Sequence, residues 1–314
     1  MKELVEDIRE TVRDGKLFVA FSGGKDSSLV AVLAKMALGP ERVELVTIDW
    51  GLYAYEKSKK IVREFAEKHG LRHTFIPSKN LQEKVWRYGP SCNACTREVK
   101  TKLLREYAKG NLVASGANSS DSWGKTGLKV FEGVYSPLYR LDKSQINAIL
   151  EYLGVEVERI GEAPQREGCK LKHLLKMLIN PNYHGRAVAV ANEILLKCLE
   201  EEGYRAELAN VKIVGPLSKN VALINVAPPL PDRLKRRIEG ELSRESTIDE
   251  VHFVEKPLKL TILANPSVYR NEEARKWIVE GRLQPEFAAP IEVEWRESTN
   301  NRLRTFQVVG FESL

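Results

Sequence analysis

Short apolar runs alternate with amphipathic stretches through the first half of the chain. The apolar runs predict strands and cover residues 17–21, 43–48, 72–76 and 112–114. The stretches between and after them place apolar residues three and four positions apart, as helices do, and cover residues 28–34, 55–69, 93–107 and 142–152. Alternation of this kind implies right-handed crossovers and a parallel, doubly wound α/β sheet.

The pattern breaks between about residues 161 and 184, where Pro164, Gly168 and Pro181 interrupt it. We therefore predict a first domain over residues 1–165, a linker over 166–184 that contains a short helix at 171–179, and a smaller α+β domain over 185–314. Helices of this second domain are expected at 187–202, after Pro231 and at 271–280. Its strands are expected at 206–214, 221–226, 251–255, 258–263, 291–295 and 303–309.

Composition narrows the class of protein. The 314 residues carry a net charge of +6. Residues 1–179 hold 30 lysines and arginines against 23 acids, and residues 180–314 hold 19 against 20. The basic excess of the first part suits ATP or another polyanion such as RNA, and it equally suits a solvated basic surface. No run of about eighteen apolar residues occurs, so we expect no membrane-spanning helix and no membrane partner. Four cysteines without an export signal suggest a reducing, cytoplasmic setting.

The segment Ser22-Gly-Gly-Lys-Asp-Ser27 lies between a predicted strand and a predicted helix. A glycine turn at this place exposes successive backbone N–H groups and the positive end of a helix dipole, which together bind anions. Gly23 and Gly24 permit the backbone angles and the close approach that an oxyanion needs. The segment therefore predicts a phosphate-binding loop, against the alternative of an ordinary glycine turn.

Side chains of the same loop add to this chemistry. Lys25 brings a mobile positive charge, and the hydroxyls of Ser22 and Ser27 bring donors. Asp26 repels phosphate, so we expect it to cap the helix or to bind phosphate-bound magnesium. Asp49 and Gly116 also follow predicted strands, and in parallel sheets such positions converge on one crevice.

The cysteines form a second candidate site. Cys92 and Cys95 make a CxxC pair at a predicted helix start, whereas Cys169 follows in a loop far along the chain. Three interpretations remain open: a 4Fe-4S cluster on three thiolates, a zinc site that lacks an evident fourth ligand, and a redox or persulfide-carrying set of thiols. Cys198 falls in an apolar helical pattern and is expected to be a buried core thiol.

The loop resembles the SGGxDS signature of the PP-loop ATP pyrophosphatases. That resemblance implies cleavage of ATP between the α and β phosphates, formation of an adenylate and release of pyrophosphate. It implies that Ser22, Gly23, Gly24, Lys25, Asp26 and Ser27 bind ATP, with Lys25 and Asp26 acting in catalysis. The spacing differs from that of the Walker-type loop.

A narrower resemblance rests on the motifs that follow. The order Cys92-x-x-Cys95, a Ser-Gly-Ala-Asn-Ser-Ser-Asp turn at 115–121, Glu-Gly-Val-Tyr-Ser-Pro-Leu at 132–138 and a helix from Lys143 looks like the LarE-type sulfur transferases. It is also similar to the cluster-dependent tRNA thiolases of the TtcA and TtuA type. The resemblance covers residues 15–175 and implies that Cys92, Cys95 and Cys169 hold a 4Fe-4S cluster, with Cys169 also catalytic. Ser120 stands where the family has the first of two acids.

The mechanism that follows from the resemblance is activation of an acceptor oxygen by adenylation, then displacement of AMP by sulfur. Asp26 and Asp121 are candidates for Mg²⁺, Gly116 for close approach of AMP, and Lys143 for phosphate. Asp49 is expected to meet the ribose or to cap its strand end. His73 is expected to be structural.

The acceptor and the partners are left open. We expect a small anionic acceptor in preference to tRNA, because residues 180–314 are nearly neutral, and sulfide or a sulfur-donor protein as the source of sulfur. Homo-oligomers remain possible from the sequence. The rival functions are a tRNA thiolase, a PP-loop ligase that uses ammonia without a cluster, and a non-catalytic nucleic-acid-binding module.

Overall fold

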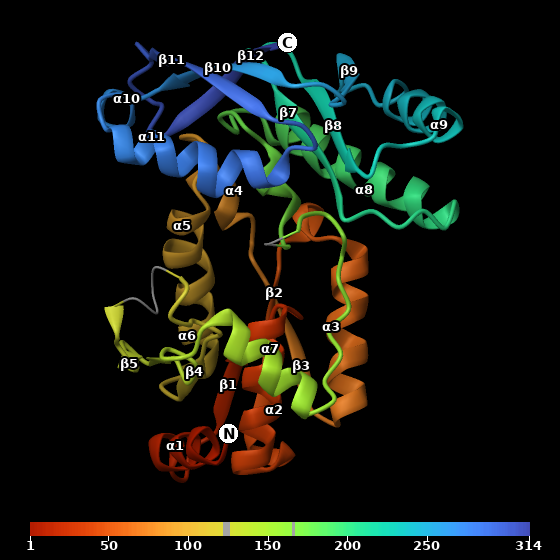
Figure 1. Cartoon of the computed structure of the whole chain (residues 1–314). Coiled ribbons are helices and arrows are strands. Elements are labelled where there is room, and N and C mark those ends of the chain that lie inside the picture. The colour runs from red at the N-terminus through yellow and green to blue at the C-terminus, as the bar shows by residue number, and fades with distance from the viewer. Residues whose placement is uncertain (122–125, 165–166) are drawn as a thin grey trace. The chain divides into compact units, whose positions relative to one another are not determined.

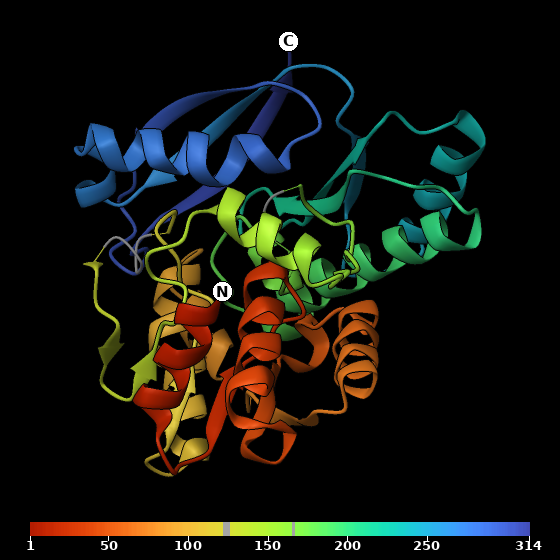
Figure 2. The same ribbon diagram turned by 60° about the horizontal axis from the view of Figure 1, so that its bottom comes forward.

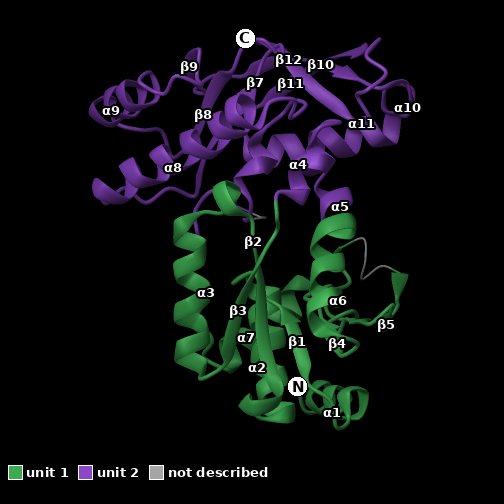
Figure 3. Ribbon diagram, turned by 180° about the vertical axis from the view of Figure 1, so that it is seen from behind, with its two compact units in different colours: residues 1–79, 96–159 green, residues 80–95, 160–314 purple. Residues whose placement is uncertain are grey.

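The computed structural model describes residues 1–121, 126–164 and 167–314 (Figure 1). The chain forms two compact units: unit 1 contains residues 1–79 and 96–159, and unit 2 contains residues 80–95 and 160–314 (Figure 3). The sequence-based division placed residues 80–95 in the first domain and treated 166–184 as a linker, whereas by contacts both segments group with unit 2. The expected boundary itself, at 165 and 166, lies outside the described residues. No helix in the described ranges is long and apolar enough to cross a membrane.

Unit 1 is built on a six-stranded sheet with the order β3-β2-β1-β4-β6-β5. All neighbouring strands are parallel except β5 and β6. Its strands are β1 (Leu17–Ala20), β2 (Val43–Asp49), β3 (Arg72–Pro77), β4 (Leu112–Ala114), β5 (Val130–Phe131) and β6 (Val134–Tyr135). Its helices are α1 (Lys2–Val12), α2 (Lys25–Leu38), α3 (Glu56–His69), α6 (Lys102–Ala108) and α7 (Lys143–Tyr152), with a π-helical turn at Thr96–Thr101 and single 3-10 turns at Pro40–Arg42 and Gly51–Tyr53.

The main core of unit 1 lies on one face of this sheet. Leu17, Val19 and Phe21 alternate toward that face and pack against apolar residues of α1, α2, α3 and α7. Figure 2 shows α1 and α2 at the front of the view. Phe18 points to the opposite face, where its ring meets that of Tyr107 on α6 at a centroid distance of 5.7 Å. Helices therefore cover both faces, as expected for a doubly wound sheet.

Unit 2 contains two three-stranded sheets, with the orders β7-β8-β9 and β11-β10-β12. The strands are β7 (Leu208–Val214), β8 (Val221–Ala227), β9 (Glu250–Phe253), β10 (Leu258–Ala264), β11 (Ile291–Glu297) and β12 (Phe306–Ser313). The helices are α4 (Leu81–Trp86), α5 (Cys92–Cys95), α8 (Arg186–Glu201), α9 (Asp232–Leu242), α10 (Pro266–Tyr269) and α11 (Glu272–Ile278). Shorter turns are 3-10 helices at Lys170–His173 and Gln284–Glu286 and π-helices at Pro181–Gly185 and Val279–Leu283.

The α/β class and the parallel sheet are confirmed, and most expected elements lie where the periodicity placed them. The expected helix at 171–179 is wrong. Only a 3-10 turn forms at Lys170–His173, and Leu174 then bridges Ile213 while the amide of Leu175 donates to the carbonyl of Ile213. This apolar stretch is extended because it packs alongside β7, so its burial, rather than helical spacing, explains its composition.

Candidate functional site

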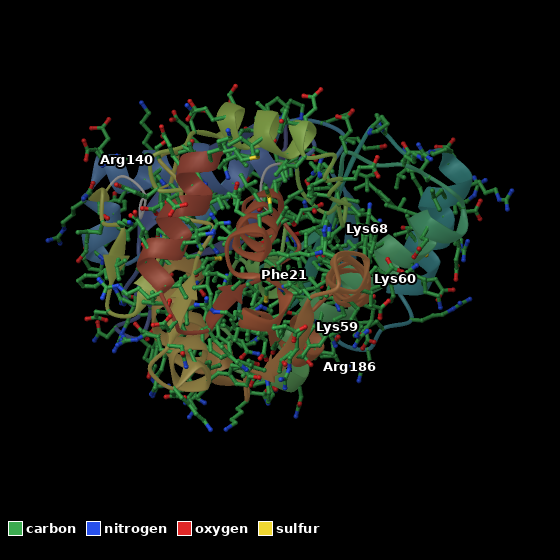
Figure 4. All side chains as sticks on the ribbon, turned by 90° about the horizontal axis from the view of Figure 1, so that it is seen from below. Phe21, Lys59, Lys60, Lys68, Arg140 and Arg186 are labelled. Carbon is green, nitrogen blue, oxygen red and sulfur yellow. The ribbon has the colours of Figure 1, made fainter. Side chains whose placement is uncertain are left out.

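The Ser22–Ser27 loop joins β1 to α2, as the sequence predicted. Phe21, labelled in Figure 4, is 2% exposed and anchors the loop in the core. Gly23 has a φ of +75°, and a β-carbon there would lie 3.0 Å from Cγ1 of Val62. Gly24 is the N-cap of α2, a 14-residue helix whose first N–H groups have no intrahelical acceptor. The loop therefore has the backbone form of an anion site.

Hydroxyl groups fix the inside of the loop. The Oγ atoms of Ser22 and Ser27 are 3.2 Å apart. Ser27 Oγ also donates to the carbonyl of Gly24 (3.0 Å) and lies 3.3 Å from the backbone nitrogen of Ser22. Ser27 is 5% exposed, so this hydroxyl primarily holds the turn closed. Of the two serines, Ser22 is the more accessible to a bound phosphate.

Asp26 does not cap the helix, because α2 has no side-chain cap and Gly24 occupies the N-cap position. Instead, its Oδ2 accepts a hydrogen bond from the ammonium of Lys143 at the start of α7. Its Oδ1 is buried and has no partner among the described residues. A buried carboxylate oxygen without a partner is a costly arrangement that a metal ion or a donor would relieve. Asp26 thus keeps its candidacy for Mg²⁺, and the cap alternative is wrong.

Gly116 lies directly against the loop. A β-carbon at this position would come within 2.8 Å of Cβ of Asp26 and 3.1 Å of the backbone nitrogen of Ser27. Its own turn is closed by Asn118, whose Nδ2 donates to the carbonyl of Gly116 (3.2 Å) and whose backbone N–H donates to Oδ2 of Asp121 (3.0 Å). The structure therefore brings the 116–121 turn to the Ser22–Ser27 loop, and only glycine fits at the contact.

Two further candidates are held by neighbours. The Lys25 ammonium donates to Oδ1 of Asn147 on α7 (2.9 Å), a partner that the sequence did not indicate. Asp49 accepts from the backbone N–H of Gly51 (2.9 Å) and lies 3.5 Å from the ammonium of Lys59 on α3, labelled in Figure 4. Asp49 thus caps the end of β2, which is one of the two roles that the sequence suggested for it. His73, also expected to be structural, pairs with Thr47 Oγ1 at 2.8 Å, and burial lowers its pKa to about 4.

Cys92, Cys95 and Cys169 all belong to unit 2. The four cysteines of the chain are all described, and none forms a disulfide. Burial raises the pKa of the Cys169 thiol, and the nearby Cys95, Cys92 and Glu162 raise it further. Cys198 is buried in α8, as expected, at 3% exposure.

Within the described ranges, no three Cys, His, Asp or Glu side chains are arranged to hold a metal ion. A zinc ion needs its ligands to converge within about 2.3 Å of one point, and the zinc alternative for these thiols stays a prediction. A 4Fe-4S cluster binds each thiolate through a different iron, and its assignment to these three cysteines stays a prediction.

A buried charge network around Cys169 escaped the sequence analysis. Glu162, which is 0% exposed, lies 2.9 Å from the ammonium of Lys172 and 2.5 Å from Nε2 of His173. Glu286 lies 3.1 Å from Lys172 and also pairs with the buried Lys212. We call these five residues the Glu162 network.

The Glu162 network fixes the loop that carries Cys169. Oε1 of Glu162 accepts from the backbone N–H of Gly168 (2.6 Å), the residue before Cys169. Lys172 and His173 follow Cys169 by three and four residues. Burial opposes ionisation of Glu162, but the charges of Lys172 and His173 outweigh it and lower its pKa. Burial lowers the pKa of Lys212, although Glu286 acts in the opposite direction.

The fold and loop together define a PP-loop ATP pyrophosphatase. A family model described as NAD synthase matches residues 1–167, more than half of the chain, and the chain belongs to that family. It is also similar to archaeal proteins named as a subunit of glutamine-hydrolyzing GMP synthase. That of Pyrococcus horikoshii is 28% identical over 68% of this chain and 76% of its own length. The protein of Archaeoglobus fulgidus is 29% identical over 50% of this chain and 57% of its own length. The protein of Thermococcus kodakarensis is 40% identical over 24% of this chain and 24% of its own length.

The comparisons confirm the superfamily and its use of ATP. They name ligases rather than sulfur transferases, so the closer resemblance to LarE-type and TtcA- or TtuA-type enzymes stays a prediction.

Proposed function

We propose that this protein adenylates an acceptor with ATP and then replaces AMP with sulfur. In the first step an acceptor oxygen attacks the α-phosphorus, the α–β phosphoanhydride bond breaks and pyrophosphate leaves. In the second step a sulfide attacks the acceptor carbon that bears the adenylated oxygen. The bond between that carbon and its oxygen breaks, and AMP leaves with the oxygen. The observation that carries the first step is the loop of unit 1, with its glycine N-cap, the Asp26–Lys143 pair and the close contact at Gly116.

Residues of unit 1 divide this work. The N–H groups at the start of α2, with Ser22 and Lys25, stabilise the charge that develops on the departing pyrophosphate. Lys143 neutralises Asp26 in the resting site, and it would be available to phosphate if the Asp26 carboxylate held Mg²⁺. Mg²⁺ would be held by Asp26, whose buried Oδ1 has no partner in the described chain, with Asp121 as the second candidate.

The choice of sulfur rests on the thiols of unit 2. Cys92 and Cys95 lie one helical turn apart in α5, and both raise the pKa of the Cys169 thiol. A 4Fe-4S cluster on these residues would supply an open iron for sulfide. Binding it would displace the proton that burial holds on Cys169.

A ligase that uses ammonia is the second candidate. The names of the relatives favour it, because they belong to glutamine-hydrolyzing GMP synthases and the matching family is described as NAD synthase. The chemistry of adenylation is the same in both candidates. They differ in the second step, where ammonia would need none of the three thiols.

The first step is tested by the nucleotide products. ATP labelled at the α-phosphate is incubated with the protein, Mg²⁺ and an ultrafiltered cell extract as the source of acceptor. We expect AMP and pyrophosphate, and we expect Lys25→Ala and Asp26→Asn to abolish them. Lys60→Ala, on the exposed face of α3 (Figure 4), is the matched control and should retain full activity. Formation of ADP and orthophosphate would exclude the assignment.

The second step is tested by the cysteines. Protein purified without oxygen should contain iron and sulfide and absorb visible light, and Cys92→Ser, Cys95→Ser and Cys169→Ser should each remove these signals. Cys198→Ser is the control and should keep them. If the three variants retain full pyrophosphate release with ammonium as donor, and the protein holds no iron, the ammonia ligase is the better assignment.

The acceptor class has its own measurement. We propose a small anion, and a gel shift with bulk tRNA and an unrelated RNA at near-physiological salt compares it with the tRNA alternative. Equal, weak binding of both RNAs is expected. Tight binding selective for tRNA, weakened by charge reversal on α3 at Lys60 and Lys68, would establish the thiolase function instead.

A further inference from the structure

The two charged side chains of the Ser22–Ser27 loop both reach the same helix of unit 1, α7. Lys25 donates to Oδ1 of Asn147 (2.9 Å), and Asp26 accepts from the ammonium of Lys143. Lys143 and Asn147 are four positions apart, so they lie on one face of α7, one turn from each other. The proposed function gives roles to Lys25, Asp26 and Lys143. Neither that function nor the comparisons give a role to Asn147.

The packing of α7 fixes the position of Asn147. The helix packs against α2 (Figure 1). Ile146, which precedes Asn147, is 0% exposed and Leu150 is 4% exposed, and both belong to the apolar core that also contains α2. The capping box of Asp142 and Gln145 holds the start of the same helix. The amide of Asn147 therefore meets the loop from a well-anchored helix.

The two contacts between α7 and the loop differ in charge. Asp26 and Lys143 neutralise each other. Asn147 is neutral, and among the described residues no carboxylate forms an ion pair with Lys25. An amide oxygen orients an ammonium without cancelling its charge. Lys25 therefore keeps one positive charge, held next to the N-terminus of α2, where phosphate is favoured.

The helix gains no stability from an asparagine at this position. Asn147 lies inside α7 and is exposed, and asparagine is a poorer helix former than alanine. Lys25 is exposed as well, so water competes for the hydrogen bond between the two side chains and the bond adds little to folding. Its effect is greater on ligand binding, because a lysine that is already ordered loses less conformational entropy when a phosphate arrives.

We infer that Asn147 is a positioning residue, which holds the Lys25 ammonium ready for the β and γ phosphates of ATP and for the pyrophosphate that leaves. Its effect on ATP is exerted through Lys25. The inference rests on the proposed adenylation step, but it needs only the binding of ATP and not the later transfer of sulfur.

Isothermal calorimetry on the full chain with Mg²⁺ tests the inference, and the probes are ATP, pyrophosphate and AMP. Asn147→Ala should weaken the binding of ATP and of pyrophosphate about three- to tenfold, because Lys25 is then ordered only when the ligand arrives. Asn147→Asp should weaken both about tenfold or more, because the new carboxylate neutralises Lys25. AMP lacks the β and γ phosphates, so Asn147→Ala should leave its affinity unchanged.

A double variant shows whether Asn147 acts through Lys25. In the Lys25→Met background, Asn147→Ala should cause no further loss of ATP affinity, because the interaction that it removes is already absent. Tyr152→Ala, at the far end of α7 and 77% exposed, is the control and should bind ATP as the unmodified protein does. Urea unfolding should show Asn147→Ala to be at least as stable as the unmodified protein, which separates a loss of affinity from a loss of structure.

The outcomes separate the inference from the function on which it rests. If the unmodified protein binds neither ATP nor pyrophosphate, the proposed adenylation step fails and the inference fails with it. If the unmodified protein binds ATP and Asn147→Ala binds it equally well or more tightly, the inference alone fails. An equal loss of affinity for ATP and AMP, or a further loss in the Lys25→Met background, would overturn it in the same way.

Discussion

Replacing Glu162 with glutamine tests whether the Glu162 network holds the Cys169 loop. The substitution keeps the shape and removes one negative charge from a side chain that is 0% exposed. Lys172 and His173 then lose a partner at 2.9 and 2.5 Å, and the remaining carboxylate, Glu286, must balance Lys172 and Lys212. Removal of one partner from a buried ion pair costs about 3 to 5 kcal/mol, because the other charge stays buried.

The assay is urea unfolding followed by tryptophan fluorescence, with Trp86 as the buried reporter of unit 2. Hydrogen exchange of the peptide that covers residues 167–173 is measured in parallel. We expect unit 2 of Glu162→Gln to unfold at lower urea, with a loss of about 3 kcal/mol. We also expect faster exchange at Gly168, whose amide donates to Glu162.

The matched control is Glu250→Gln in the same unit. Glu250 pairs with Lys219 and both side chains are 43% exposed, so the loss of this pair should leave the urea midpoint nearly unchanged. If Glu162→Gln unfolds within about 0.5 kcal/mol of the unmodified protein, a range typical of neutral surface substitutions, the network does not stabilise the loop. Unchanged exchange at Gly168 would have the same meaning.

Three further predictions follow from single contacts. Gly116→Ala should abolish pyrophosphate release, because its β-carbon would lie 2.8 Å from that of Asp26, while Gly240→Ala in α9, where nothing lies within 4 Å, should leave product formation intact. Acid should destabilise unit 2, because folding lowers the pKa values of Glu162 and Glu286 from 4.5. The stabilisation that these carboxylates contribute is present above pH 4.5 and is lost as the pH falls through their pKa values in the folded chain. Urea midpoints measured between about pH 7 and 3 would record this loss. Burial lowers the pKa of Lys176 from 10.5 to about 7. Between these pH values the unfolded chain binds one proton more than the folded chain does, so the free energy of unfolding should rise with pH from about 7 to 10. Lys176→Met should remove this rise.

The first half of the fold was predictable because its signals are local. The strands β1 to β4 lie where short runs of the sequence predicted them, whereas the two-residue strands β5 and β6 were not predicted. Asp142 and Gln145 form a capping box at the start of α7, the helix expected at 142–152. The loop at 22–27 was found for the same reason, since both its glycines and its neighbours are contiguous.

The contacts of the site that the sequence did not indicate are long-range. Lys25 meets Asn147, which lies 122 residues away, and Lys212 meets Glu286, which lies 74 residues away. Periodicity favours an exposed position for charged residues, so the buried lysines of unit 2 gave no signal. The extended segment after His173 was mistaken for a helix because a short apolar run fits either state.

The interrupted course of unit 2 has a consequence for synthesis on the ribosome. Residues 80–95 are made early, yet their partners are made late: the carbonyl of Trp86 accepts from the amide of Leu178 (3.0 Å), and that of Tyr88 accepts from the amide of Arg304 (2.8 Å). Since domains fold as their residues emerge, the sheet of unit 1 can form while the residues that pack on Trp86 have not yet been made. The CxxC segment therefore lacks these partners through the synthesis of roughly two thirds of the chain. In that interval Cys92 and Cys95 lack the packing partners of the folded chain, in which both thiols are only partly buried.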